Sequence, residues 1–515
     1  WKNKSLIRSL KKLFTGYIYM IRILVYPLFI LTLFGAIRAR QLDLTLISPQ
    51  FFSVIAILTL VGIVSFFFRD RIKLLFFQFY RVGVMHFKFF VGISIFLIGV
   101  LQVIILLNTQ TPIGWDVGDV MKAIVDPKNG VEYASINPNN LFLISVYHII
   151  YHAFLPTSGF SAYTWAFFQV LTAIELDISV VAIVIFACKI FNKEVALNTY
   201  LLFCFLFILT PYIQTPYSDI AVLLPTSLSL LCFVALETTN NKYLQIILTI
   251  LIGFFFVIVY EIKPSAVVLL IAWIIDTLFR FLKTDRNRKR LEVCGLVVLL
   301  IFSFAIGQKC VNDIIESQTP VHVVKNRALP WQHFVLMGMT GNGGYNSAIR
   351  QKTLDYVTTE KMARHSTQEL EKRLKQLNPV GYLQFLVGKQ IRNTDRGDFA
   401  WGQEGVPQFP FKKTKGILQD RIRSLYLIGG RNQINLSFYY QIVWLITLTG
   451  ILFSLMKANL DKEKWISVFI LGMLGAFLYL LLFEGGRSRY LIQYLPMLLP
   501  LAAWGWHSRH GYQLS

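Results

Sequence analysis

The chain has 515 residues, of which 55% are hydrophobic and only 15% are charged. A soluble domain cannot hide that much apolar surface in one core, so a bilayer must supply part of its surroundings. The formal charge of +22 would suit nucleic acid, but the basic residues gather in short loops between apolar runs, where they set orientation in a membrane. We therefore expect a membrane protein surrounded by membrane lipids, with no nucleic-acid partner.

Apolar runs of roughly 18 to 28 residues recur along the chain, long enough to cross a hydrocarbon core of about 30 Å as helices. No alternating strand pattern competes with them, so the predicted fold is an all-α polytopic membrane protein. The first run is too long for a signal-peptide core and is expected to be retained. About twelve spans are expected, at residues 17–36, 51–68, 89–108, 165–190, 196–210, 220–236, 243–260, 265–279, 291–308, 438–456, 466–483 and 491–504.

Basic clusters within residues 2–12, 69–88 and 280–290 should all stay cytoplasmic. They agree with one threading of the chain if the apolar segment 141–154 does not cross the membrane. That segment is short and contains His148, so we predict a re-entrant or juxtamembrane helix there. The outer side then receives the loop 109–140, the turns near Asp219, Lys263 and Arg487, and a long loop at 310–437.

This threading divides the chain into four parts. Residues 1–88 are a basic segment with two extra spans, 89–309 a membrane module with an outer loop at 109–162, 310–437 an extracytoplasmic loop domain, and 438–515 the last spans. The long loop is expected to be folded, because Ser366 and Glu369 resemble a capping box that begins a helix at 366–377. The five cysteines lack metal-like spacing, and all but Cys310 lie inside apolar runs, so neither disulfides nor a zinc site is expected.

Acidic residues follow the third predicted span. Asp116 and Asp119 lie in the first outer loop, and Asn139 and Asn140 precede the segment 141–154. A carboxylate at the membrane surface, backed by an apolar helix, suits a general base that removes a proton from a hydroxyl. The alternative is a solvated loop with two ordinary aspartates and an Asn-Pro turn.

Two further outer turns carry polar residues beside predicted spans. Tyr217 and Asp219 precede one span, where Asp219 either belongs to a site or caps the helix. Glu261 and Lys263 end another, where Lys263 either binds a lipid phosphate or extends from a helix end to the interface.

The last outer turn carries Arg487 and Arg489, followed by Tyr490. Two arginines on the outer side oppose the positive-inside bias, so an anion is expected to offset them, and a phosphate matches their planar forks. The alternatives are pairing with Glu484 or with lipid headgroups.

These elements follow one another in an order, and on a common outer side of the membrane, that resembles the GT-C class of membrane glycosyltransferases, which use polyprenyl-phosphate sugars. Within that class they look closest to bacterial members that decorate cell-envelope polymers. The shared elements are Trp115, Asp116 and Asp119, the stretch 137–140, and the turns 217–219, 263–265 and 487–490. The resemblance implies that Asp116 is the catalytic base, with Asp119 as the second candidate, and that Lys263, Arg487 and Arg489 bind the donor phosphate. The candidates for substrate binding are Asn139, Asn140, His148, Tyr217, Asp219, Glu261 and Tyr490.

The chain departs from the class in two respects. Two predicted spans precede the first outer loop, and Ser218 stands where metal-dependent members carry a second carboxylate beside the position of Asp219. No cofactor is therefore expected to be required, and the need for a divalent metal stays open.

The activity implied is inverting transfer of a hexosyl or pentosyl residue from a polyprenyl-phosphate donor to an envelope glycan, a teichoic acid or a protein. It would take place on the extracytoplasmic face of the cell membrane. A transporter or flippase of lipid-linked sugars, and a polymerase or ligase that uses lipid-diphosphate glycans, would bind a similar anionic lipid. A broken helix at the bilayer midplane or internal repeats would favour transport, and neither is evident in the sequence.

Overall fold

The computed structural model describes residues 2–67, 78–155, 161–283, 287–403 and 410–510. Within these ranges every regular element is a helix and no β-strand occurs, which confirms the predicted all-α class for the described part of the chain. Four basic residues of the predicted cytoplasmic clusters, Arg69, Arg71, Lys73 and Arg286, lie outside the described residues.

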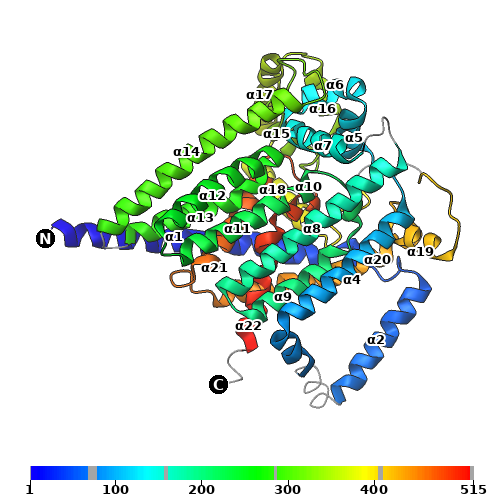
Figure 1. Ribbon diagram of the computed structural model, residues 1–515, viewed down its shortest axis with the longest axis horizontal. Helices are drawn as coiled ribbons and strands as arrows, with labels where there is room; N and C mark the ends of the chain where they lie inside the picture. The colour runs from blue at the N-terminus through cyan, green and yellow to red at the C-terminus, as the bar shows by residue number, and fades with distance from the viewer. Residues whose placement is uncertain (1, 68–77, 156–160, 284–286, 404–409, 511–515) are drawn as a thin grey trace.

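A bundle of helices forms the body of the molecule. Its members are α1 (Lys2–Ile37), α4 (Phe87–Thr109), α8 (Ala162–Ile190), α9 (Lys193–Phe203), α11 (Leu223–Thr238), α12 (Lys242–Ile262), α13 (Val268–Lys283), α14 (Asn287–Gln318), α20 (Gln433–Lys457), α21 (Lys464–Leu482) and α22 (Leu495–His510). Helix α2 (Pro49–Phe67) meets α20 near its start, where Phe51 contacts Phe438, and then stands apart from the body (Figure 1). Within the body, α4, α8, α11, α12 and α14 pack in that order, and α20, α21 and α22 pack beside them (Figure 1).

A second group of helices gathers at one end of this body (Figure 1). They are α5 (Trp115–Val125), α6 (Pro127–Ile136), α7 (Leu141–Phe154), α15 (Trp331–Gly338), α16 (Ser347–Leu354) and α17 (Thr359–Gln376). We call this group the cap. It combines the first outer loop with part of the long loop 310–437, two segments that the sequence placed on the same side of the membrane.

Among the described residues, nine helices are long and apolar enough to cross a membrane. The predicted spans at 51–68, 196–210 and 491–504 are not among the nine, so the count of about twelve is not confirmed. Two of the three change helix type: α9 runs into a π-helical turn, η3 (Cys204–Ile208), and the 3-10 helix η6 (Ser488–Tyr494) precedes α22. This leaves α9 with 11 residues and α22 with 16, fewer than the roughly 20 of a full crossing.

The predicted re-entrant segment forms α7 with the predicted bounds, Leu141–Phe154. Its 14 residues are too few to span a hydrocarbon core as a helix. It packs against α5, α12 and α14, so it connects the cap with the body.

The predicted capping box at Ser366 is wrong. Helix α17 begins at Thr359, and Ser366 is buried in its middle. The helical pattern extends further toward the N-terminus than the capping signal indicated, and Arg364 pairs with Glu360 one turn away at 2.5 Å. Glu369 pairs with Lys372 at 2.6 Å instead of reaching back to the start of a helix.

One helix of the long loop leaves the cap and packs into the body. Helix α18 (Pro379–Thr394) lies against α1 and α21, near the centre of Figure 1. Its Gln390 donates to the hydroxyl of Thr32 on α1 at 3.2 Å. The side-chain amide of Gln441 on α20 donates to the carbonyls of Ala36 and Asp395, at 2.9 and 2.8 Å. Helix α1, which the sequence resemblance left without a role, therefore forms part of the support for α18.

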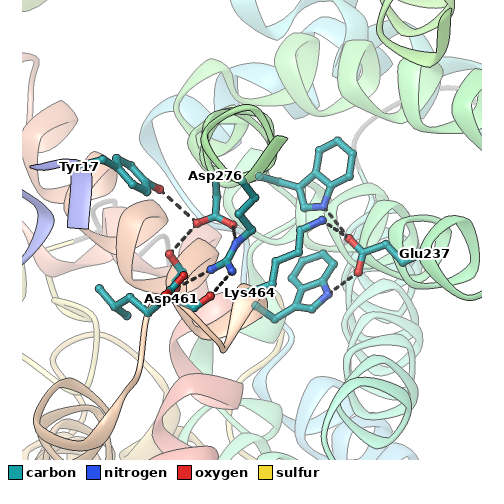
Figure 2. A network of polar contacts seen from close by, with 10 residues as sticks. Tyr17, Glu237, Asp276, Asp461 and Lys464 are labelled. Carbon is teal, nitrogen blue, oxygen red and sulfur yellow. Dashed lines mark hydrogen bonds and ion pairs between the residues drawn. The ribbon is translucent and has the colours of Figure 1, made fainter. Parts of the chain in front are cut away.

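Polar side chains also join helices at the end of the body distant from the cap (Figure 2). The buried carboxylate of Asp276 on α13 accepts from the Tyr17 hydroxyl at 3.3 Å, from the Ser467 hydroxyl at 2.6 Å and from Arg280 Nε at 2.6 Å. Arg280 also donates to two backbone carbonyls of the turn between α20 and α21. These contacts compensate a buried charge and fix α1, α13 and α21 to one another.

A second carboxylate completes this network. Glu237, at the end of α11, accepts from Lys464 Nζ at 2.6 Å and from the indole nitrogens of Trp465 and Trp273 at 3.0 and 3.2 Å (Figure 2). Charged and aromatic residues of this kind are typical of the region where a helix leaves the hydrocarbon core.

The arrangement predicts that the cap and the turn at 458–463 face opposite aqueous compartments. The 19 residues of α21 rise about 28 Å between the turn at 458–463 and the cap end. In a protein without its native cysteines, Glu371→Cys on α17 should react with an impermeant maleimide on intact cells. Lys462→Cys should react only after the membrane is opened. Reaction of both positions from the same side would contradict the predicted threading.

Candidate active site

A cavity of about 190 Å³ opens where the cap meets the loop after α21. Its wall combines the start of α5, the chain around α16 and the turn that leads into η6. The polar side chains that line it are Asp116, Asp119, Tyr133, Tyr212, Thr215, Tyr345, Arg350, Glu484, Arg487, Arg489 and Tyr490. Residues that are distant in the sequence are therefore brought to one small volume.

Asp116 lies in the first turn of α5, where its side chain is exposed. The helix follows Gly114, and Trp115 has a left-handed φ of 58°. This conformation costs a residue with a Cβ atom about 1 kcal/mol or more. The indole of Trp115 remains 53% exposed and meets the ring of Tyr345 edge-on at 5.8 Å. The carboxylate of Asp116 lies at the positive end of the helix dipole, which favours its ionised form.

Asp119 is the weaker of the two acidic candidates by its surroundings. It lines the same cavity but forms an ion pair at 3.3 Å with Lys122 on the same helix, and both side chains are about half exposed. Ion pairs between exposed side chains contribute little to the free energy of folding. The charge of Asp116 acts on deeper groups: burial first, and then the Asp116 carboxylate, raise the pKa of Tyr133 and of Tyr217 well above the usual range.

Tyr133 is held by a short chain of hydrogen bonds. The side-chain amide of Asn140 donates to the Tyr133 hydroxyl at 2.8 Å, and Tyr133 in turn hydrogen-bonds Tyr217. Asn140 is 2% exposed and does not line the cavity, so it supports a cavity residue from behind. Asn139 is exposed and is not among the lining residues.

Asp219 forms the charged centre behind the cavity. Its carboxylate is 2% exposed; one oxygen bonds Lys263 Nζ, and the other lies 3.0 Å from Arg489 Nε. The Arg489 guanidinium lies 5.5 Å from the ring centroids of both Tyr217 and Tyr490. Lys263 is buried and does not line the cavity, whereas Arg489 does. Of the three predicted phosphate ligands, Lys263 is therefore not brought to the cavity wall and pairs with Asp219 behind it.

The turn after α21 supplies the remaining charges. Arg487 lines the cavity and donates to the backbone carbonyl of Gln403 at 3.4 Å. Glu484 accepts from the Tyr490 hydroxyl at 2.9 Å. Burial raises the pKa of Glu484, and the Tyr490 hydrogen bond and Arg487 oppose that rise. The turn thus places one carboxyl group and two guanidinium groups on the same cavity.

Of the seven predicted substrate residues, only Tyr490 lines the cavity. Tyr217 is buried beside Arg489 and is not part of the wall, and two further residues make other contacts. His148 on α7 hydrogen-bonds the backbone carbonyl of Ile124 at 3.4 Å, and burial together with His152 lowers its pKa. Glu261 accepts from Gln308 on α14 at 2.7 Å. Both residues join helices, so His148 and Glu261 have no direct place in the cavity wall.

Sequence reasoning missed Tyr133, Tyr345, Arg350 and the lining role of Glu484. The signal for Glu484 was its place in the turn beside Arg487. Tyr345 and Arg350 belong to the long loop, and no local pattern placed that part of the chain against Asp116. Among the described residues, no cluster of three or more His, Cys, Asp or Glu is arranged to hold a metal ion.

The buried charges predict an unequal response of two aspartates. Asp219→Asn would leave Lys263 and Arg489 as insufficiently compensated buried cations, a change that costs about 3–5 kcal/mol. Asp119→Asn, the matched control at a half-exposed pair, should cost less than about 1 kcal/mol. The midpoint of thermal unfolding in detergent should fall strongly for the first variant and little for the second. Equal midpoints would contradict the central role of Asp219.

Comparison with solved structures finds distant similarity. The archaeal oligosaccharyltransferase AglB from Archaeoglobus fulgidus, solved with an inhibitory peptide and a dolichol-phosphate, aligns at 14% identity and a TM-score of 0.41, over 83% of this chain and 52% of AglB. This chain thus spans about half the length of AglB. ArnT from Cupriavidus metallidurans, bound to undecaprenyl phosphate, aligns at 11% identity and a TM-score of 0.34, over 81% of this chain and 78% of ArnT.

Sequence comparison gives the family. No curated protein sequence matches the chain significantly. The profile of one family matches residues 13–510, which is nearly the whole chain and includes every residue of the cavity wall. The protein therefore belongs to this family, which is described as conserved hypothetical integral membrane protein.

Proposed function

We propose that the protein is a glycosyltransferase that moves one sugar from a polyprenyl-phosphate donor to a hydroxyl group of an envelope glycan, a teichoic acid or a protein. The reaction takes place on the extracytoplasmic face of the membrane. The observation that carries the proposal is the shared cavity, in which the exposed carboxylate of Asp116 lies in one wall with Arg487 and Arg489. The motif resemblance of the outer turns supports the same chemistry.

The phosphate of the donor is bound by Arg487 and Arg489. Each guanidinium can form two parallel hydrogen bonds with phosphate oxygens, and neither loses its charge at physiological pH. Lys263 does not contact the phosphate in this proposal. It shares Asp219 with Arg489, and this pairing orients Arg489 from behind.

The transfer is a single inverting displacement. Asp116 accepts the proton of the acceptor hydroxyl while that oxygen forms a bond to the anomeric carbon of the donor sugar. The bond between the anomeric carbon and the phosphate oxygen breaks, and the polyprenyl phosphate leaves with the electron pair. Arg487 and Arg489 stabilise the negative charge that develops on the departing phosphate. Tyr133, whose raised pKa keeps it protonated, adds no charge to the cavity.

A flippase for lipid-linked sugars would need the two arginines but no proton acceptor. A ligase for lipid-diphosphate glycans would need the two arginines and a proton acceptor, but it would bind a diphosphate. The exposed position of Asp116, at a helix N-terminus beside the arginines, favours a transferase over a flippase. The donor assay below separates all three.

If Asp116 is the base, its replacement should reduce sugar transfer without weakening the binding of the donor lipid. In Asp116→Asn the amide is nearly isosteric with the carboxylate, so folding and undecaprenyl-phosphate binding should stay close to the unmodified protein. Sugar transfer from a panel of polyprenyl-phosphate sugars should fall by roughly two to four orders of magnitude, because the proton acceptor is gone. Purified protein in detergent allows both measurements in one preparation.

Asp119→Asn is the matched control, since it removes a carboxylate from the same helix and the same cavity. It should reduce transfer less than Asp116→Asn. A larger loss at Asp119 would exchange the two roles, and full transfer by Asp116→Asn would refute the assigned base. Lipid movement without any transfer by the unmodified protein would identify a flippase instead, and use of diphosphate donors alone would identify a ligase.

If Arg487 binds the donor phosphate, donor affinity should depend on the planar geometry of its guanidinium group and not only on its charge. Arg487→Lys keeps one positive charge but removes the planar fork, so donor affinity should fall by about tenfold, which corresponds to roughly 1.4 kcal/mol. Thermal unfolding should change little, because lysine keeps the positive charge that acts on Asp219 and Glu484. Arg431→Lys, at an exposed pair remote from the cavity wall, serves as the control. Unaltered donor affinity in Arg487→Lys would assign this arginine to lipid headgroups.

A further inference from the structure

The turn that carries Glu484 and Arg487 is held from behind by α18. Lys389 of this helix is fully buried, and its Nζ donates to the carbonyls of Gly338 at 2.6 Å, Leu481 at 3.0 Å and Phe483 at 2.6 Å. The three acceptors belong to two helix ends, since α15 ends at Gly338 and α21 ends at Leu482. One side chain thus connects the cap, the body and the turn.

The chemistry of helix ends explains why a lysine is stable at this position. The last carbonyls of a helix have no partner within the helix and form the negative end of its dipole. Burial lowers the pKa of Lys389 to about 7, the Glu484 carboxyl group opposes this fall and Arg392 adds to it. Only the ammonium form has three N–H donors and can bond all three carbonyls at once. Lys389 therefore compensates unpaired carbonyls of two helices at once.

Asn393, one helical turn after Lys389, holds the next part of the same turn. Its side-chain oxygen accepts from the Gly486 amide at 2.6 Å, and its nitrogen donates to the Leu480 carbonyl at 3.3 Å. Residues four apart lie on the same face of a helix, so Lys389 and Asn393 act on the turn together. The amide of Gly485 donates to the Gly343 carbonyl at 2.8 Å and ties the turn to the cap.

At two glycines of this contact there is no space for a side chain. A Cβ atom added at Gly485 would lie 2.7 Å from the Asn393 side-chain oxygen, and one at Gly343 would lie 2.6 Å from the Lys389 side chain. Gly486 has a φ of 70°, a conformation that favours glycine. The backbone direction from Gly485 to Arg487 is therefore fixed by α18 and the cap together.

We infer that Lys389 and Asn393 are positioning residues for the proposed donor-phosphate site: they fix the turn 483–487 so that Arg487 is presented to the cavity in one orientation. Neither residue lines the cavity, so both act through the backbone of the turn. The inference rests on the proposed function for its effect on the donor. The anchoring of the turn itself can be measured without any substrate.

Hydrogen exchange of the peptide 483–490 tests the anchoring. Lys389→Met keeps an unbranched apolar chain in place of the lysine stem but removes all three hydrogen bonds. Exchange at Gly485 and Gly486 should become about tenfold faster or more, as expected for the loss of buried hydrogen bonds. Asn393→Leu should have the same effect, and it provides a second test if Lys389→Met does not fold.

Gln390→Met is the matched control. Gln390 lies beside Lys389 on the same helix and is equally buried, but it bonds Thr32 on α1 and not the turn. Its replacement should lower the thermal midpoint without changing exchange in 483–490. Unchanged exchange in both Lys389→Met and Asn393→Leu would overturn the inference, and so would an equal change in Gln390→Met.

Binding of undecaprenyl phosphate then links the anchor to the site. Lys389→Met and Asn393→Leu should weaken this binding by about tenfold, the change that a misdirected arginine fork predicts, while Gln390→Met should leave it unchanged. Faster exchange with unaltered binding would overturn the positioning role. If the unmodified protein binds no undecaprenyl phosphate and transfers no sugar, the proposed function fails, whereas the anchoring of the turn still stands on the exchange data.

Discussion

The candidate site depends on one buried carboxylate between two cations. Asp219 lies in the short helix α10 (Ser218–Ala221), Lys263 follows α12, and Arg489 lies in η6, so two other parts of the chain converge on Asp219. Two buried cations would repel each other strongly in surroundings with little water. Asp219 between them allows them to approach one another. Arg489 therefore reaches the cavity wall, where Arg487 and the carboxyl groups of Asp116 and Glu484 also lie.

The same rule governs the interior of the bundle. Where no water is present, each polar group needs a protein partner, and side-chain amides provide several of them. Gln102 on α4 donates to Asp177 at 3.0 Å and to the Ile208 carbonyl at 2.9 Å, and Gln169 donates to the carbonyls of Thr111 and Gln214. Ile208 ends the π-helical turn η3, and Gln214 ends the 3-10 helix η4 (Pro211–Gln214), so two of these acceptors lie where a non-α helix ends. Glutamines of α4 and α8 therefore stabilise these non-α turns.

The sequence predicted those parts of the molecule that depend on local pattern. Apolar runs located the long helices, and α7 was found with its observed bounds because a 14-residue apolar run has few other solutions. Asp116, Arg487 and Arg489 could be named because polar residues in short turns between spans are conspicuous. Contacts between distant segments could not be predicted in this way. Nothing local shows that Arg350 lines the same cavity as Asp116, that Lys263 lies behind the cavity, or that α18 leaves the long loop to support the turn after α21.

The strained backbone at Trp115 lowers the stability of the fold at a residue of the cavity wall. Glycine would adopt the observed φ of 58° without steric cost, so a tryptophan at this position makes the folded state less stable than it could be. Strain of this kind persists only where the surroundings over-determine it, and here the first turn of α5 and the ring of Tyr345 do so. The strained residue presents its indole in the cavity wall with 53% of its surface exposed. Glycine at this position would relieve the strain but would remove that aromatic surface from the cavity, so the stability of the fold and the aromatic wall cannot both be greatest with one residue.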